Sequence, residues 1–272
     1  MELPIFFKPR VVTIAAVTAA SLSISGLASG AVLVNDTFDV GASPSIGDDA
    51  DDPQDVAWTA VRGGASLDTA DTAFTGNALQ LEATGITTFN QVKAALPAPV
   101  SLTHIDDFIR ITAQVRAYTT LEDNGSGFRL GFVDSGSTTS SLFGKIAVGA
   151  SSNLEAAFAP NPQTGGSNNV NLNSTASDGF DDQDVHTVSV TLVRTASGAD
   201  VTVTFDGDSV TGSASASQLA GSYDEIWLAT GSVTTDFRYD NIVVETGVIP
   251  EPASLALFGL GGLWMLGRWG RR

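Results

Sequence analysis

Cysteine is absent from the 272 residues, and there are only two histidines, His104 and His186. Without cysteine, disulfides and cysteine-ligated metals are excluded, so stability must come from the core or from a cation held by oxygen ligands. The two histidines lie far apart, so no histidine-rich metal motif is present. The Gly-x-Ser-x-Gly motif of many serine hydrolases is also missing.

Basic residues are scarce. The chain has 13 Lys and Arg against 30 Asp and Glu. Residues 31–247 hold 8 of the basic and 28 of the acidic residues, which gives this region a net charge of −20. So acidic a region repels phosphate backbones, which argues against nucleic acid as a partner. It suits divalent cations, neutral glycans or solubility in salt.

Long amphipathic helical patterns are also lacking, and short segments with period-two alternation recur instead. The clearest strands are predicted at residues 108–118, 186–194, 199–205 and 237–245, with a hairpin loop at 195–198. Weaker strands are predicted at 31–38, 58–61, 78–83, 90–94, 127–133, 145–148 and 225–229. About eleven short strands indicate an all-β fold, an antiparallel β-sandwich or jelly roll. Residues 41–55 and 160–184 are predicted to be long loops.

The N-terminal segment has the pattern of a secretory signal peptide. Lys8 and Arg10 precede an apolar run at 11–27, and Ala28-Ser29-Gly30 supplies small residues for cleavage by signal peptidase. We therefore expect a signal peptide at 1–30 and a domain at 31–247. An uncleaved N-terminal anchor is the alternative.

The C-terminal segment, 248–272, has three parts. Pro250-Glu251-Pro252 is followed by fourteen uncharged residues at 253–266 and by three arginines among the last five residues. A helix of fourteen residues rises about 21 Å, which is short for a hydrocarbon core of about 30 Å. Interfacial tryptophans and snorkelling arginines nevertheless favour a transmembrane helix with the domain outside. A buried terminal helix is the alternative.

This order of parts resembles the PEP-CTERM protein-sorting signal of Gram-negative bacteria. The resemblance implies that an exosortase processes the chain and that the cargo ends in the cell envelope or extracellular matrix. It assigns recognition to Pro250, Glu251 and Pro252, the transient membrane span to 253–266, and the stop to Arg268, Arg271 and Arg272.

The middle of the chain resembles the concanavalin A-like or laminin-G-like jelly rolls of secreted bacterial proteins. The resemblance lies in Asn-Asp-Thr-Phe-Asp at 35–39, Gly-Asn-Ala-Leu-Gln-Leu at 76–81, the hairpin of 186–194 with 199–207, and Tyr-Asp-Asn-Ile-Val-Val at 239–244. In such folds the first and last strands often lie side by side. That implies a structural Ca²⁺ site at Asp36, Asp39 and Asp240, because calcium takes oxygen ligands. Surface aspartates in turns are the alternative.

Aromatic residues are candidates for stacking on sugar rings. Trp58, Trp227 and Tyr223 are the candidates, and Tyr223, beside Gly221 and Asp224 in an expected loop, looks least like a core residue. The alternative for each is a place in the core.

These patterns favour an exported, non-enzymatic protein that binds carbohydrate or matrix polymer. A structural envelope protein without a small ligand is the second hypothesis. A glycoside hydrolase is the third, because no carboxylate pair stands out and the Glu-x-Asp-x-x-Glu strand of laminarinase-like hydrolases is missing.

Overall fold

The computed structural model describes residues 30–38, 55–68, 72–74, 76–82, 90–118, 127–136, 141–146, 153–159, 168–175, 182–230 and 236–249. They form fifteen β-strands and one short 3-10 helix, η1 (Ala216–Gln218). Within these ranges, no helix has the length and apolar character needed to span a bilayer. The expected signal peptide up to residue 29 and the apolar segment at 253–266 lie outside them.

Eight antiparallel strands form the first sheet, in the order β13-β12-β11-β6-β15-β4-β3, with β1 paired to β15. They are β1 (Gly30–Asp36), β3 (Gly64–Asp68), β4 (Ala78–Glu82), β6 (Asp107–Ala117), β11 (His186–Arg194), β12 (Gly198–Phe205), β13 (Asp208–Ser215) and β15 (Phe237–Val248). The long β15 lies beside β6 along one edge, and β1 and β4 share its other edge. The first and last strands are therefore neighbours, as the jelly-roll resemblance implies.

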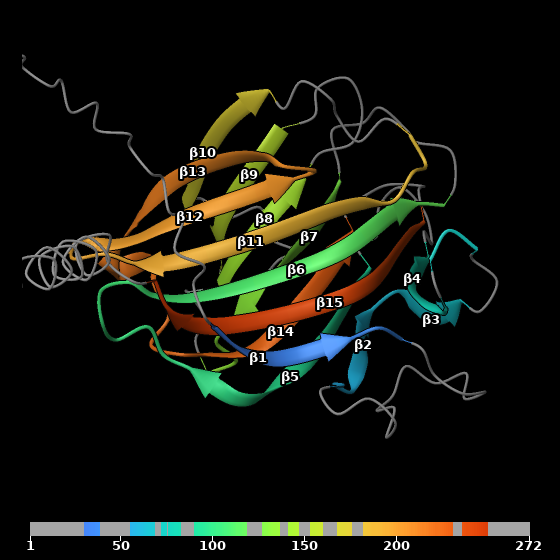
Figure 1. Ribbon diagram of the computed structural model, residues 1–272, viewed down its shortest axis with the longest axis horizontal. Coiled ribbons are helices and arrows are strands. Elements are labelled where there is room, and N and C mark those ends of the chain that lie inside the picture. Colours follow the sequence, from blue (N-terminus) through green and yellow to red (C-terminus); the bar gives the residue numbers. More distant parts are fainter. Residues whose placement is uncertain are drawn as a thin grey trace, which may run out of the picture.

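Seven antiparallel strands form the second sheet, in the order β10-β9-β8-β7-β14-β5-β2. They are β2 (Trp58–Arg62), β5 (Gln91–Val100), β7 (Phe128–Val133), β8 (Ser141–Ile146), β9 (Asn153–Ala159), β10 (Asn168–Thr175) and β14 (Tyr223–Thr230). The two sheets overlie one another (Figure 1). All-β antiparallel sheets packed in this way agree with the expected sandwich.

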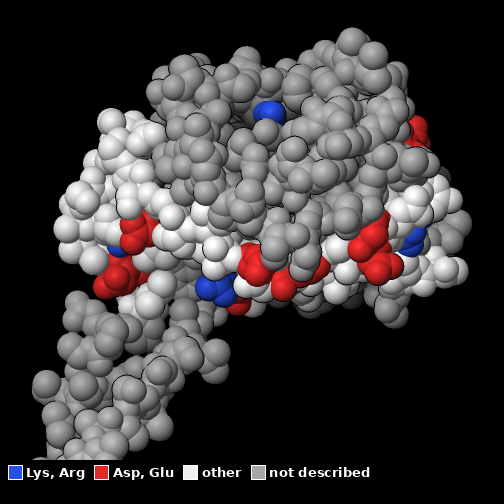
Figure 2. Space-filling view, turned by 90° about the horizontal axis from the view of Figure 1, so that it is seen from above, with Lys and Arg blue, Asp and Glu red and all other residues white. Residues whose placement is uncertain are grey.

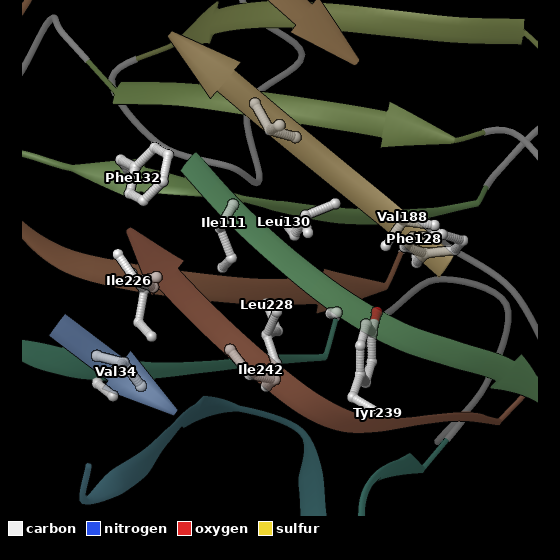
Figure 3. Packing of buried hydrophobic residues seen from close by; sticks show 14 of the residues in the cluster. Val34, Ile111, Phe128, Leu130, Phe132, Val188, Ile226, Leu228, Tyr239 and Ile242 are labelled. Carbon is white, nitrogen blue, oxygen red and sulfur yellow. The ribbon is translucent and has the colours of Figure 1, made fainter. Parts of the chain in front are cut away.

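The core lies between the sheets. Along β6, buried apolar side chains alternate with half-buried polar ones from Ile109 to Ala117, so one face of the strand is in the core and the other faces outward. Figure 3 shows Ile111 and Ile242 of the first sheet with Leu130 and Leu228 of the second, and all four are fully buried. Burying each such side chain stabilises the fold by about 1.5–3 kcal/mol.

Gly144 in β8 marks a place where the two sheets approach closely. It is buried, and a Cβ atom at this position would overlap the side chain of Val190 in β11. The close approach therefore requires a residue without a side chain here.

The four clearest predicted strands are confirmed as β6, β11, β12 and β15, and the predicted hairpin loop is closed by the Thr195 amide donating to the Gly198 carbonyl at 2.9 Å. The prediction of one long loop at 160–184 is wrong in part, because β10 occupies 168–175 and pairs with β9. Asparagine favours turns, so a segment rich in asparagine was predicted to be a loop. Strand propensity depends strongly on context, and here pairing with the neighbouring strand supports a strand. The expected loop at 41–55 lies outside the described residues except at its end.

The strand predicted at 90–94 is longer than expected. It continues to Val100 through Pro97 and Pro99, which lack the N–H that a ladder needs. A register shift against β14 falls at this point, and such irregularities are where strands accommodate proline.

Candidate functional site

An open groove lies on the outer face of the first sheet, over β6, β11 and β12, and encloses about 480 Å³. Six of its lining side chains carry hydroxyl groups: Thr112, Thr187, Ser189, Thr191, Thr202 and Thr204. The others are Arg110, Val188, Val193, Gly207 and Ile249. We call this surface the hydroxyl groove.

The hydroxyl side chains are aligned by strand register. One row crosses four strands through Ser209, Thr204, Ser189 and Thr112. The next crosses them through Thr211, Thr202, Thr191 and Arg110. Neighbouring strands lie about 4.8 Å apart, and residues two positions apart along one strand are separated by about 7 Å. The outer face of the sheet therefore presents hydroxyls as a two-dimensional array, which continues from the groove onto β13, where the Thr202 and Thr211 hydroxyl oxygens are 2.8 Å apart.

The groove is nearly free of charge although the chain is strongly acidic. Arg110 is the one ionisable side chain among its described lining residues. Its Nε donates to the Thr191 hydroxyl at 3.1 Å, and its Nη1 lies 3.6 Å from Oε2 of Glu245. Elsewhere, Figure 2 shows several groups of acidic side chains on the face it presents. The groove therefore suits a polar ligand without a large net charge.

One end of the groove is fixed by a buried histidine. The two ring nitrogens of His186 lie 2.6 Å from Oδ2 of Asp206 and 2.8 Å from Oδ1 of Asp182. Asp206 also accepts the Thr187 amide at 2.8 Å, and the His186 ring stacks on Phe205 at 4.8 Å between centroids. These contacts hold the turn before Gly207 against β11, where Thr187 and Gly207 line the groove.

The same contacts affect the acidity of Asp182. Partial burial acts to raise the pKa of its carboxyl, but hydrogen bonds from the Asp184 amide and from His186, together with the charge of His186, hold that pKa below its usual value.

The other end of the groove is formed by Ile249, the last described residue before Pro250. The Ile249 amide donates to the carbonyl of Asp106 at 2.9 Å, so the chain is held to the sheet up to this residue. The groove thus ends where the C-terminal segment begins.

Trp227, one of the three predicted glycan contacts, is half-buried on the outer face of the second sheet. Its Nε1 donates to Oε2 of Glu225 at 2.8 Å. Nζ of Lys93 lies 2.6 Å from Oε1 of Glu225 and 5.7 Å from the centroid of the indole ring. On its other side Trp227 pairs with Gly131, which has no side chain to cover the ring.

The other two predicted glycan contacts are core residues. Trp58 is 4% exposed and Tyr223 is 1% exposed, so neither ring offers a face to a sugar. The expectation that Tyr223 lies in a loop is wrong, because it is the first residue of β14. A register shift between Tyr223 and Glu225 separates it from the alternation of the strand. Burial raises the pKa of the Tyr223 hydroxyl to about 12.

The predicted calcium ligands are distributed as follows. Asp36, at the end of β1, is buried and accepts the indole N–H of Trp58 at 2.7 Å and the Phe38 amide at 3.1 Å. Asp240 is also buried and accepts the Asn241 amide at 2.7 Å. Asp39 lies outside the described residues. The described ranges contain no group of three or more His, Cys, Asp or Glu side chains that is arranged to hold a metal.

Sequence reasoning did not identify the hydroxyl groove. The signal was present, because Thr187, Ser189 and Thr191 alternate with apolar residues, as do Thr202 and Thr204. This alternation predicts an outward-facing polar surface, but only strand register shows that the hydroxyls form adjoining rows.

The fold is shared with proteins whose structures have been solved. A carbohydrate esterase, vb_24B_21, from the Shiga toxin-encoding bacteriophage phi24B is 16% identical with a TM-score of 0.52, and the match covers 80% of this chain and all of that one. Lectin II from Ulex europaeus is 13% identical with a TM-score of 0.45, over 80% of this chain and all of the lectin. The carbohydrate recognition domain of Emp47p is 14% identical with a TM-score of 0.45, over 70% of this chain and 89% of that domain. At 16% identity the likeness to the esterase is one of fold alone. No curated protein matches the chain.

The C-terminal segment is identified by its sequence. Residues 248–272 match the PEP-CTERM protein-sorting motif, which confirms the resemblance and implies export. Pro250, Glu251, Pro252, Arg268, Arg271 and Arg272 fall within the matched segment and outside the described residues.

Proposed function

We propose that the protein is exported to the cell surface or extracellular matrix of a Gram-negative bacterium, where its β-sandwich binds an uncharged polysaccharide in the hydroxyl groove. The observation that carries this proposal is a nearly charge-free groove lined by six hydroxyl side chains on a strongly acidic chain. A hydroxyl group both donates and accepts hydrogen bonds, so an array of them matches the mixed donors and acceptors of a sugar. Carboxylates on the ligand would be repelled by the surrounding acidic surface.

Delivery follows from the two ends of the chain. Signal peptidase removes residues 1–30, the apolar segment at 253–266 holds the chain in the membrane with the domain outside, and an exosortase recognises Pro250-Glu251-Pro252. Arg268, Arg271 and Arg272 stop transfer on the cytoplasmic side. The PEP-CTERM match supports this route.

Trp227 is a second glycan contact in this proposal. Its half-buried indole lies on the outer face of the second sheet and pairs with Gly131, and a tryptophan in such a position can stack on the apolar face of a sugar ring. Lys93 and Glu225 flank it and supply hydrogen-bonding groups for the sugar hydroxyls.

Binding is favoured over hydrolysis by the chemistry of the groove. Most glycosidases use two carboxylic acids on either side of the scissile bond, and the described residues that line the groove include no carboxylate. A purely structural envelope protein is the second candidate, and it predicts no glycan binding.

The test is binding of the full chain, purified in detergent, to neutral polysaccharides such as a β-glucan and a galactomannan, with alginate as the anionic comparison. Each of Thr191→Val and Thr202→Val removes one groove hydroxyl at nearly constant shape. One lost hydrogen bond is worth about 0.5–1.5 kcal/mol, so we expect about two- to tenfold weaker binding for each variant.

Thr72→Val is the matched control, because Thr72 is exposed in a turn between β3 and β4 and neither lines the groove nor pairs with Trp227 or Lys93. It should bind the neutral polymers like the unaltered chain. The proposal is wrong if no neutral polymer binds, or if all three variants weaken binding equally.

A further inference from the structure

Both apolar terminal segments leave the sandwich at one place. Gly30 in β1 pairs with Gly247 in β15, and Ala31, the first residue after the expected signal peptide, pairs with Thr246, so the start of the domain lies beside the strand end that leads to Pro250. In Figure 1 this is the end of the first sheet at which β15 finishes and β6 begins.

This end also carries exposed apolar side chains. Five large hydrophobic residues are exposed in the described chain, and three of them are here: Val32 (38%), Ile105 (56%) and Val248 (55%). Val248 pairs with Asp107, and the next residue, Ile249, hydrogen bonds to Asp106, so Val248 and Ile105 belong to adjoining segments. We call Val32, Ile105 and Val248 the exit rim.

Two acidic side chains near the exit rim are engaged within the protein. Glu245, which pairs with Val32, lies 3.6 Å from Arg110. Oδ2 of Asp107 accepts the amides of Thr103 at 2.9 Å and His104 at 2.6 Å, so this carboxylate is directed into its own loop. The exposed residues of that loop, Thr103 to Ile105, include no acid. The three side chains of the exit rim are therefore apolar on a strongly acidic molecule, and Asp106, next to Ile105, is half-exposed.

The length of the chain beyond the rim limits where the rim can be. Ala253, the first residue of the apolar run, is four residues after Ile249, and at no more than about 3.6 Å per residue their Cα atoms are at most about 14 Å apart. The headgroup layer of one leaflet is about 5–8 Å thick. When 253–266 is in the membrane, the sheet end at Ile249 must therefore lie within about 6–9 Å of the outer surface of the headgroups.

We propose that the exit rim rests on the lipid headgroups of the membrane that holds the C-terminal segment. This inference relies on the membrane attachment in the proposed function. It also orients the hydroxyl groove, because the Ile249 end then faces the membrane and the Gly207 end, with His186 and its two aspartates, points away from it.

The absence of cysteine allows a direct test. Single cysteines are introduced as Ile105→Cys, Val248→Cys and Tyr118→Cys, and each is labelled with the fluorophore NBD. The full chain is then reconstituted into phosphatidylcholine vesicles that contain a headgroup spin-labelled lipid quencher. Tyr118 is the matched control, because it is another exposed hydrophobic residue just past the opposite end of β6, about 34 Å along the strand.

We expect the fluorescence of the labels at 105 and 248 to be quenched and that of the label at 118 to change little. A Gly-Ser linker of ten residues between Ile249 and Pro250 should reduce quenching at 105, because it releases the distance limit. Flotation of the vesicles shows whether the chain is inserted. An inserted chain with no quenching at 105, or with equal quenching at 118, overturns the rim contact and leaves glycan binding untouched. A chain that does not float with the vesicles overturns the membrane attachment and the rim contact together.

Discussion

At the scale of single residues, Asp36 and Trp58 form a buried polar pair. From the sequence, Asp36 is a candidate metal ligand and Trp58 a candidate for stacking on a sugar. In the fold, the indole N–H of Trp58 donates a hydrogen bond of 2.7 Å to the Asp36 carboxylate. Trp58→Phe keeps an aromatic ring and removes that donor. Loss of a donor to a buried acceptor costs about 1–3 kcal/mol, so urea unfolding should show a decrease in stability of that size. An unchanged free energy of unfolding would mean that the hydrogen bond contributes nothing.

Thermal unfolding tests the calcium prediction for Asp36, Asp39 and Asp240. A lower Tm in EDTA than in buffer with added calcium would support a bound cation. If EDTA leaves the Tm of the unaltered protein where it was, these aspartates hold no structural calcium, and the hydrogen bonds of Asp36 to Trp58 and Phe38 account for its burial.

Asp182 gives a pH dependence with a definite sign. Because the pKa of its carboxyl is lowered from 3.8 on folding, its contribution to stability is fully present above about pH 4. That contribution is lost as the pH falls through the lower pKa of the folded protein, because the protonated carboxyl no longer offers a negative charge to His186 and to the Asp184 amide. Asp182→Asn should therefore be less stable than the unaltered protein at pH 6, and the difference should shrink below pH 4. Asp184→Asn is the control, since it retains the amide that Asp182 accepts. A difference that stays constant from pH 6 to pH 3 would contradict this assignment.

At the scale of strands, the separation of the sheets is set partly by Gly144. Gly144→Ala places a methyl group against Val190, and overpacking of this kind costs about 1–3 kcal/mol. Gly221→Ala is the matched control, because no atom lies within 4 Å of a Cβ placed there, and its change should stay within about 0.5 kcal/mol. Chemical unfolding of the two variants measures the change in stability that each substitution causes. Equal stabilities would show that the sheets move apart without cost.

The strands also show how far sequence reasoning reaches. Alternation is local, so β6, β11, β12 and β15 were predictable, as were the outward-facing hydroxyls on β11 and β12. Register is not local. The placement of Thr202 beside Thr191 depends on the pairing of β11 with β12, and the burial of Tyr223 accompanies a register shift against β5. The hydroxyl groove and the buried environment of Tyr223 therefore could not be predicted from the sequence without the strand pairing.

At the scale of the whole molecule, the proposed recognition tripeptide comes directly after Ile249, whose amide is bonded to the Asp106 carbonyl. Replacing Pro250-Glu251-Pro252 by Ala-Ala-Ala removes two residues that disfavour a helix and the carboxylate between them. In a host that carries an exosortase, we expect the variant to keep its C-terminal segment, seen as a larger band on an immunoblot of the membrane fraction. Processing at the normal rate would show that the tripeptide is not the recognition element.

The pairing of Gly30 with Gly247 has a practical consequence for protein engineering. Directly paired Cα atoms of antiparallel strands are about 5 Å apart, so the sandwich begins and ends at nearly one point. A module with this geometry can be spliced into a surface turn of an unrelated host without stretching the host backbone. The sandwich could thus be inserted into another protein as a domain, without the terminal segments that direct export of the original chain.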